Sequence, residues 1–401
     1  MISFRKKIFL SIFMTFAFFM VLEVGTRLLE FFKYHDKYWL LFATPYARQV
    51  DSSILSDSIQ EQGELQKVYG QKFYYQMVQK DGFYLFRPGR HPMLLPGYPP
   101  MTASINSLGL RGKEVSHEKS RDTYRVVVLG ESAVFGTTVN DEETVSCHLE
   151  HFLNHGVGES THVEIINGGM PGATSSTELA LFHAVIAPLH PDLIVLYSGF
   201  NDHSAKTEQR SSFLYQLSYE LHGLLYYKSL FYTLTLEKFS LWFTGRADAL
   251  WGMRFRVISS PEDVHSVIDR YTANVHALID STRPKGIRVL LVTQPLWFSP
   301  YASKLSEETQ VKRIESTIEN RKDISREEYR YFMQSKLMGA LHGIANSDTL
   351  PLVDAVGTFE GIDPLRRGRL FSDTVHLTPA GNKFLAETIA NAILEQQLAK
   401  N

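Results

Sequence analysis

Residues 125–132 read RVVVLGES, an apolar and largely β-branched run that ends in a glycine, an acid and a serine. A continuous apolar run of this length suits a strand that is covered on both faces, as in a parallel sheet between helices. The sequence therefore predicts a buried parallel strand here. Further runs of the same kind follow at residues 163–166 (VEII), 193–197 (LIVLY), 289–292 (VLLV) and, more weakly, 352–353 (LV).

Segments with helical spacing lie between these strands. Residues 145–153 and 264–279 carry apolar residues at intervals of three and four, the pattern of a helix with one buried face. Ser175 followed by Glu178 predicts a capping box, and Thr378 followed by proline predicts the start of a last helix. The alternation predicts a doubly wound, flavodoxin-like α/β fold, a three-layer parallel sheet with helices on both faces. Ligands bind such sheets at the carboxyl ends of the strands.

Composition and charge exclude several classes of protein. The 401 residues are 44% hydrophobic and 21% charged, which is ordinary for a globular protein and excludes a disordered chain or a polytopic membrane protein. The net charge of −2, from 41 basic and 43 acidic residues, makes nucleic acid an unexpected partner. The only cysteine, Cys147, excludes an intramolecular disulfide, and we expect it to be a small buried residue.

The N-terminus has the pattern of a targeting segment. Three basic residues at 5–7 precede an uncharged apolar run at 8–22. Fifteen helical residues span about 22 Å against a hydrocarbon core of about 30 Å, so the run reaches across only if Glu23 extends to the headgroups. We expect residues 1–33 to form an uncleaved, single-pass signal-anchor helix in the cytoplasmic membrane, with the rest of the chain periplasmic or otherwise extracytoplasmic. A cleaved signal peptide and a buried helix are the alternatives.

Two further segments stand apart from the alternating pattern. Residues 34–120 show no clean period and many prolines and glycines, which predicts an irregular lead-in that packs on a main domain at 121–401. An insertion at about 204–262 contains ten aromatic residues between 213 and 243. We expect a helical subdomain there, with a substrate lid or a membrane-contacting surface as alternatives.

Chemically useful residues follow the predicted strands. Strand one is followed by Ser132, strand two by residues 167–172 (NGGMPG) and strand three by residues 199–202 (GFND). Residues 373–376 (DTVH) precede the last helix, and residues 294–297 (QPLW) follow strand four, where they can form a pocket wall or only a structural loop. Because the carboxyl ends of parallel strands meet at one edge, we expect these segments to converge.

These residue types suit acyl transfer. A serine hydroxyl such as that of Ser132 is a weak nucleophile until a base removes its proton, and His376 can be that base. Asp373 can fix the tautomer of His376 and stabilise the imidazolium. The amides of Ser132 and Gly172 and the side-chain amide of Asn201 can donate to a developing oxyanion.

The four blocks, in this order, resemble the SGNH (GDSL-type) hydrolase family, and the resemblance covers residue 125 to the C-terminus. The NSLGLRG stretch at 106–112 and the N-terminal apolar run are similar to a bacterial membrane-anchored branch of that family. Ser132 is then the nucleophile and first oxyanion-hole donor. The family pattern makes His376 and Asp373 the rest of the catalytic triad, and Gly172 and Asn201 the rest of the oxyanion hole. Within the second block, Gly172 matches this role better than Gly169.

One residue departs from the family pattern. Glu131 stands where the first block usually has aspartate, which puts rate and fine geometry in doubt but removes no member of the triad. The resemblance implies a serine esterase that forms an acyl-enzyme on Ser132 and needs no metal or nucleotide cofactor. The preferred substrate is an O-acetyl or short O-acyl ester of an envelope carbohydrate or lipid; protein partners stay open.

Two other functions fit the same residues. An O-acyltransferase would pass the acyl group from Ser132 to a sugar hydroxyl in place of water. A non-enzymatic envelope protein could keep the fold for binding a glycan or a protein.

Overall fold

The computed structural model describes most of the region after residue 100 and part of the region before it. The described ranges are 4–33, 77–80, 83–86, 88–93, 101–156, 162–203, 256–257, 259–297, 307–322 and 324–396, with a few single positions between 225 and 242.

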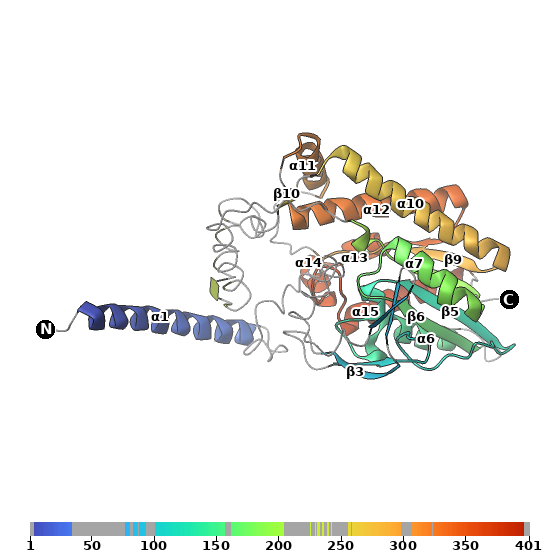
Figure 1. Ribbon diagram of the computed structural model, residues 1–401, viewed down its shortest axis with the longest axis horizontal. Helices are drawn as coiled ribbons and strands as arrows, with labels where there is room; N and C mark the ends of the chain where they lie inside the picture. Colours follow the sequence, from blue (N-terminus) through green and yellow to red (C-terminus); the bar gives the residue numbers. More distant parts are fainter. Residues whose placement is uncertain are drawn as a thin grey trace.

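A five-stranded parallel sheet forms the centre of the molecule (Figure 1). Its strands are β5 (Thr123–Gly130), β6 (His162–Gly169), β7 (Leu193–Tyr197), β9 (Arg288–Val292) and β11 (Leu352–Val353). Their spatial order is β11-β9-β7-β5-β6, and every neighbouring pair is parallel. The two strands that come first in sequence therefore reverse their order in space, as in a doubly wound sheet. The expected α/β fold with five parallel strands is confirmed.

Helices cover both faces of this sheet. On one face, α6 (Val145–Gly156) and α15 (Pro379–Glu395) pack together against the strands. On the other face lie α7 (Ser175–Leu181), α10 (Pro261–Thr282) and α12 (Arg326–Asp348) (Figure 1). Alternate residues of β5 enter the two apolar clusters, Val127 and Leu129 on one side and Val126 and Val128 on the other. This is why the strand is apolar at every position rather than at every second one.

The other described elements lie outside the central sheet and its main covering helices. The remaining helices and strands are α1 (Phe4–Lys33), α5 (Ser132–Phe135), α11 (Glu307–Glu319), α13 (Ala355–Glu360), α14 (Pro364–Arg367), β1 (Met77–Lys80), β2 (Phe83–Phe86), β3 (Gly89–Met93), β4 (Met101–Ile105), β8 (Arg256–Val257) and β10 (Ile324–Ser325). Single helical turns occur at η3 (Asp141–Glu143), η4 (Phe182–Ile186), η5 (Ala187–Leu189), η6 (Phe200–Asp202), η7 (Arg283–Lys285) and η8 (Gly368–Leu370).

The lead-in is more regular than expected. β1 pairs with β2 and β3 pairs with β4, both antiparallel. The interpretation of residues 34–120 as irregular is therefore wrong at these four strands. Each of these strands has only four or five residues, and β3 contains Pro92, so no alternating pattern is long enough to be recognised. Residues 34–76 lie outside the described part.

The N-terminal segment forms one continuous helix, α1, which extends away from the rest of the chain in Figure 1. In the described part of the protein, no helix is both long enough and apolar enough to span a membrane. The expected membrane-spanning anchor is thus not supported. Glu23 of α1 accepts hydrogen bonds from Ser229 Oγ (2.7 Å) and the Phe231 amide (3.0 Å). The rest of the predicted aromatic insertion lies almost entirely outside the described residues.

Candidate active site

Strand β5 delivers a serine to the carboxyl edge of the sheet. β5 ends at Gly130, Glu131 is extended (φ −103°, ψ −151°), and Ser132 begins the single-turn helix α5. A Cβ on Gly130 would lie 2.2 Å from the carbonyl oxygen of Tyr197 on β7. Only glycine fits this close approach, so the residue that ends the strand is dictated by its neighbour. Ser132 is 4% exposed.

Three side chains that are far apart in sequence form a continuous hydrogen-bonded relay. Ser132 Oγ lies 2.8 Å from His376 Nε2, and His376 Nδ1 lies 2.6 Å from Asp373 Oδ2. All three residues are buried. In this arrangement a neutral imidazole donates from Nδ1 to the carboxylate, which leaves Nε2 as an acceptor for the serine proton.

The loop that carries the acid and the base is held by its own backbone and by a neighbouring loop. The amides of Val375 and His376 donate to Asp373 Oδ1 at 2.8 and 2.7 Å. The Trp297 amide donates to the carbonyl oxygen of Thr374 at 2.7 Å. Asp373 therefore accepts three hydrogen bonds, which fix the position of its carboxylate beside His376.

The loop after β9 supports the site rather than offering a flat aromatic wall. The Trp297 ring is stacked on Phe371 with centroids 6.2 Å apart, and the Arg367 guanidinium lies over it at 5.7 Å. Both contacts occupy ring surface that a ligand would need for stacking. The structure thus favours the structural alternative for Trp297.

The loop after β6 places Gly172 beside the side chain of Asn201. Asn201 Nδ2 donates to the carbonyl oxygen of Ala173, the next residue after Gly172, at 3.0 Å. Gly172 has a φ of +74°, which favours glycine. The amide of Gly169 instead donates to Asn167 Oδ1 at 2.9 Å, so Gly169 is not available as an oxyanion donor. The structure brings the candidate donors Gly172 and Asn201 together.

The turn that carries Asn201 is fixed by two buried side chains. The amides of Gly199 and Asn201 donate to Glu131 Oε1 at 2.9 and 3.1 Å. The amide between them, that of Phe200, donates to Gln294 Oε1 at 3.1 Å. Sequence reasoning recognised Glu131 only as a departure from the family pattern and did not foresee this contact.

Buried acids lie behind the same turn. Burial raises the pKa of Glu131 to about 8, and burial raises the pKa of Asp202 to about 6. Burial, with the neighbouring charges of Glu131 and Asp202, also raises the pKa of Glu178 well above its usual range. At neutral pH, Glu131 is therefore mostly protonated.

The predicted capping box at Ser175 is wrong. The N-cap of α7 is Thr174, and Ser175 is already helical. The Ser175 hydroxyl and amide both donate to Asp202, at 2.5 and 2.9 Å. A partner distant in sequence thus overrides the local capping signal, which the spacing alone could not reveal.

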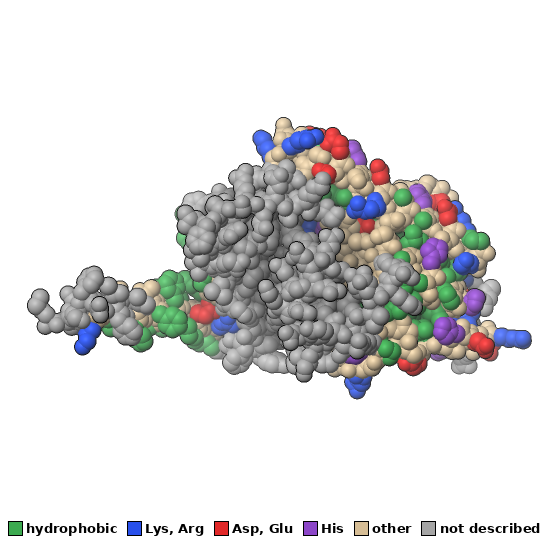
Figure 2. All heavy atoms as spheres, viewed as in Figure 1, with side chains coloured by type: hydrophobic (Ala, Val, Ile, Leu, Met, Phe, Trp, Pro, Cys, Tyr) green, Lys and Arg blue, Asp and Glu red, His purple; other side chains and the backbone are tan. Residues whose placement is uncertain are grey.

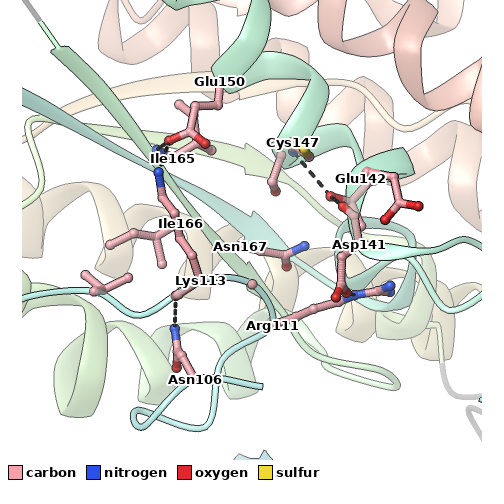
Figure 3. Close-up of a pocket in the computed structure, with 14 residues that line it drawn as sticks. Asn106, Arg111, Lys113, Asp141, Glu142, Cys147, Glu150, Ile165, Ile166 and Asn167 are labelled. Carbon is pink, nitrogen blue, oxygen red and sulfur yellow. Dashed lines mark hydrogen bonds and ion pairs between the residues drawn. The ribbon is translucent and has the colours of Figure 1, made fainter. Parts of the chain in front are cut away.

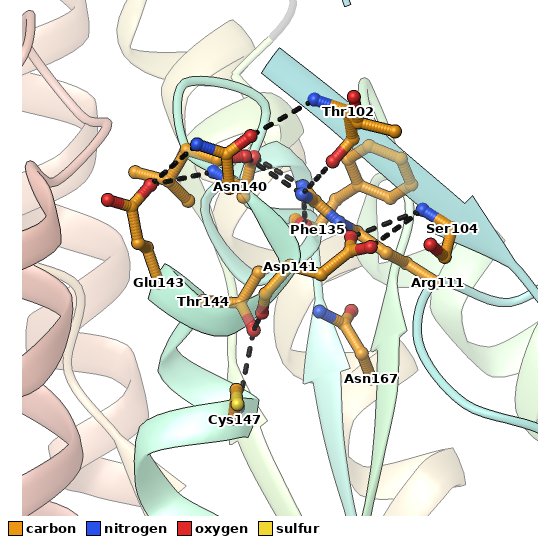
Figure 4. A network of polar contacts seen from close by, with 12 residues as sticks. Thr102, Ser104, Arg111, Phe135, Asn140, Asp141, Glu143, Thr144, Cys147 and Asn167 are labelled. Carbon is orange, nitrogen blue, oxygen red and sulfur yellow. Dashed lines mark hydrogen bonds and ion pairs between the residues drawn. The ribbon is translucent and has the colours of Figure 1, made fainter. Parts of the chain in front are cut away.

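A buried arginine from the lead-in holds the turn that follows the serine (Figure 4). Arg111 is 2% exposed. Its guanidinium donates to Asp141 Oδ1 at 2.8 Å. It also donates to four carbonyl oxygens, those of Thr102, Phe135, Gly136 and Val139. The NSLGLRG stretch is therefore part of the framework around α5.

A cavity of about 290 Å³ lies beside this network, between the lead-in, β6 and α6 (Figure 3). Charged side chains line it, including Lys113, which pairs with Glu150 at 2.6 Å. Cys147 also faces it and is exposed. The expectation that Cys147 is buried is wrong, because it lies on the polar side of α6.

The C-terminal half of the chain matches a protein-family model. Residues 238–389 match the model of the GDSL-like lipase/acylhydrolase family, a stretch that includes Asp373 and His376. This part of the chain is similar to GDSL-like lipase/acylhydrolase domains, which supports a serine hydrolase acting on ester bonds. Ser132 precedes the matched stretch and is joined to it by the 2.8 Å contact with His376.

Solved structures of other proteins are similar to this chain at low identity. The lipase/acylhydrolase from Enterococcus faecalis is 14% identical with a TM-score of 0.39, covering 68% of this chain and 96% of that one. The acetyl xylan esterase AlAXEase is 15% identical with a TM-score of 0.40, covering 67% and 99%. A catalytic mutant of an acetylxylan esterase from Geobacillus stearothermophilus is 15% identical with a TM-score of 0.39, covering 69% and 96%. No curated protein matches the sequence.

Proposed function

We propose that this hydrolase cleaves short O-acyl esters, O-acetyl esters foremost, of a cell-envelope carbohydrate or lipid through an acyl-enzyme on Ser132. The observation that supports this most is the relay from Ser132 Oγ through His376 to Asp373, at 2.8 and 2.6 Å. The low exposure of Ser132 leaves little room beside the hydroxyl, which favours a short acyl group over a long one.

The reaction proceeds in two balanced halves. Ser132 Oγ attacks the ester carbonyl carbon while its proton passes to His376 Nε2, and Asp373 stabilises the resulting imidazolium. The tetrahedral oxyanion accepts hydrogen bonds from the Ser132 and Gly172 amides and from Asn201 Nδ2. Its collapse releases the alcohol, which takes the proton from His376. Water then attacks the acyl-enzyme by the same steps and releases the carboxylic acid.

A matched ester series tests the substrate class. The full chain is assayed on acetylated xylan oligosaccharides, on a glyceride and on p-nitrophenyl esters of two to twelve carbons. We expect the highest kcat/KM on acetyl esters, free acetate as the product, and a loss of more than about a thousandfold in Ser132→Ala. Full activity in Ser132→Ala would overturn the proposal. Acylated acceptor with little free acetate would instead select the O-acyltransferase.

We also propose that α1 holds the enzyme at a membrane, with the hydrolase domain on the extracytoplasmic side. Large apolar side chains are exposed along α1, among them Phe13, Phe16, Phe19 and Leu29 (Figure 2). Such side chains are stabilised in a lipid environment. Fractionation of cells that make the full chain should recover it in the membrane pellet, and external protease should cleave it in spheroplasts. Recovery in the soluble fraction would contradict this location.

A further inference from the structure

The carboxyl group next to the nucleophile connects two parts of the active site. Glu131 immediately precedes Ser132 and is completely buried. Its Oε1 atom accepts the amides of Gly199 and Asn201, at 2.9 and 3.1 Å. One side chain therefore ties the turn that presents the serine to the turn that presents the Asn201 side chain.

The second turn is also held by other elements: Ser175 and Arg270 donate to Asp202, and β7, which leads into the turn, pairs with β5 as far as Gly130. Gln294 holds the Phe200 amide from the β9 side at 3.1 Å, and Asn201 Nδ2 reaches the Ala173 carbonyl at 3.0 Å. Neither contact involves the segment that carries Ser132. Within the described part of the chain, Glu131 is the side chain whose hydrogen bonds join the 199–201 turn to the segment that carries Ser132. It therefore helps to set the distance between the Ser132 amide and Asn201 Nδ2, which an oxyanion must bridge.

The surroundings of this carboxyl keep it uncharged at neutral pH. Burial raises the pKa of Glu131 to about 8, Asp202 adds to this, and the Asn201 and Gly199 amides oppose it. The other ionisable groups that interact with this cluster are Glu178, Tyr197, Tyr271 and Arg270. The carboxyl and the two phenols among them are neutral when protonated. The cationic Arg270 side chain donates to the Asp202 carbonyl at 3.0 Å.

We propose that Glu131 is a positioning residue of the hydrolase. The two hydrogen bonds that it accepts from backbone amides place the Asn201 side chain where it and the Ser132 amide can donate to the same oxyanion. This inference rests on the proposed function, because it assumes that Ser132 is acylated. Glu131 acts through Asn201 and does not touch the reacting atoms. Ionisation of Glu131 would place a negative charge behind the developing oxyanion and slow the reaction.

A double-mutant cycle tests the route through Asn201. In full-length protein, kcat and KM for an acetyl ester are measured for Glu131→Ala, Asn201→Ala and the double variant. We expect kcat to fall about 100-fold in Glu131→Ala and about 100- to 1,000-fold in Asn201→Ala, with KM changed less than about threefold. The double variant should be no more than about threefold worse than Asn201→Ala, because the two changes remove one interaction.

Two controls separate positioning from folding. Glu131→Gln keeps the Oε1 acceptor and should restore kcat to within about threefold of wild type. Glu178→Ala truncates a second buried acid of the same cluster. In the described part of the chain, the 199–201 turn makes no hydrogen bond to Glu178. The Glu178→Ala variant should keep kcat within about threefold of wild type. Losses that multiply in the double variant, or an undiminished kcat in a folded Glu131→Ala, would overturn the proposal.

The pH profile gives an independent readout. Wild-type kcat should decline above about pH 8, as Glu131 ionises, and Glu131→Gln should lack this decline. The same decline in Glu131→Gln would contradict the role of the uncharged acid. Full activity in Ser132→Ala would instead show that the proposed function fails. That outcome is distinct from additive losses in the Glu131 and Asn201 double-mutant cycle, which would overturn only the positioning role.

Discussion

Two buried ionisable side chains flank α5, and the protein treats them in opposite ways. Arg111 lies below the end of the helix, and the described chain gives it five hydrogen bonds to oxygen atoms (Figure 4). Glu131 lies at the beginning of the helix, and its Oε1 accepts two amides while its Oε2 has no partner in the described part.

The difference lies in how each group meets the cost of burial. Burial lowers the pKa of Arg111, whereas Asp141 raises it, and a guanidinium surrounded by acceptors stays protonated in proteins. For Glu131, two amides offset only part of the desolvation, and a nearby acid adds to it. The acid therefore takes up a proton. The short helix α5 is therefore held by a charged group at one end and an uncharged one at the other.

The largest expected effect is the loss of the charged group. Arg111→Met removes the donor to the carbonyls of the turn. Within the described part of the chain, it leaves the Asp141 carboxylate with only the Ser104 amide among its partners from distant segments. We therefore expect the free energy of unfolding to fall by about 3–5 kcal/mol. Urea denaturation followed by circular dichroism measures it. A loss below about 1 kcal/mol would break the comparison, because Arg111 would then be no different from a surface charge.

A second effect concerns the uncharged group; it is smaller per pH unit and accumulates as pH changes. Glu131 has a pKa of about 8 in the folded protein against 4.5 as its ordinary value, so the folded state binds more protons between these pH values. The stability from the neutral acid is fully present below pH 4.5 and is lost as pH rises to about 8.

We expect the difference in unfolding free energy between wild type and Glu131→Gln to change by up to about 1.4 kcal/mol per pH unit across this interval. Urea titrations at pH 5, 6, 7 and 8 give the slope. A difference that does not vary with pH would mean that Glu131 is ionised in the folded protein.

The smallest effect is expected for a lysine on the same loop as Arg111. Lys113 pairs with Glu150 at 2.6 Å, but its side chain is 51% exposed. Exposed pairs contribute little because water and salt screen them, so Lys113→Met should cost less than about 1 kcal/mol. The same denaturation assay serves as the matched control for Arg111→Met, and a loss near that of Arg111→Met would show that burial is not what separates the two residues.

Local patterns were sufficient to predict the sheet and its helices. The continuous apolar runs around Val127, Ile194 and Leu290 place strands that are covered on both faces, and Thr378 does cap α15 by accepting the Gly381 amide at 3.2 Å. Ser132 was named from its position after the first strand, and Asp373 and His376 from their place before the last helix; the structure brings the three side chains together. These predictions succeed because the signal lies within a few residues of the feature it predicts.

Features that depend on distant partners were not accessible in this way. The hairpins β1-β2 and β3-β4 are too short to show a period, and the partner of Ser175 is Asp202, 27 residues away. The role of Arg111 requires four carbonyls from two separate segments. Such contacts arise only after the chain has folded, and no spacing within one sequence encodes them.

The central claim is that Ser132 is a nucleophile activated by His376, and covalent labelling tests it most directly. The full chain is treated with a fluorophosphonate and digested, and the modified peptide is identified by tandem mass spectrometry. We predict one adduct on Ser132, at least a hundredfold slower labelling in His376→Ala, and no adduct in Ser132→Ala. An unlabelled wild-type enzyme that hydrolyses esters, or an adduct on another serine, would contradict the account.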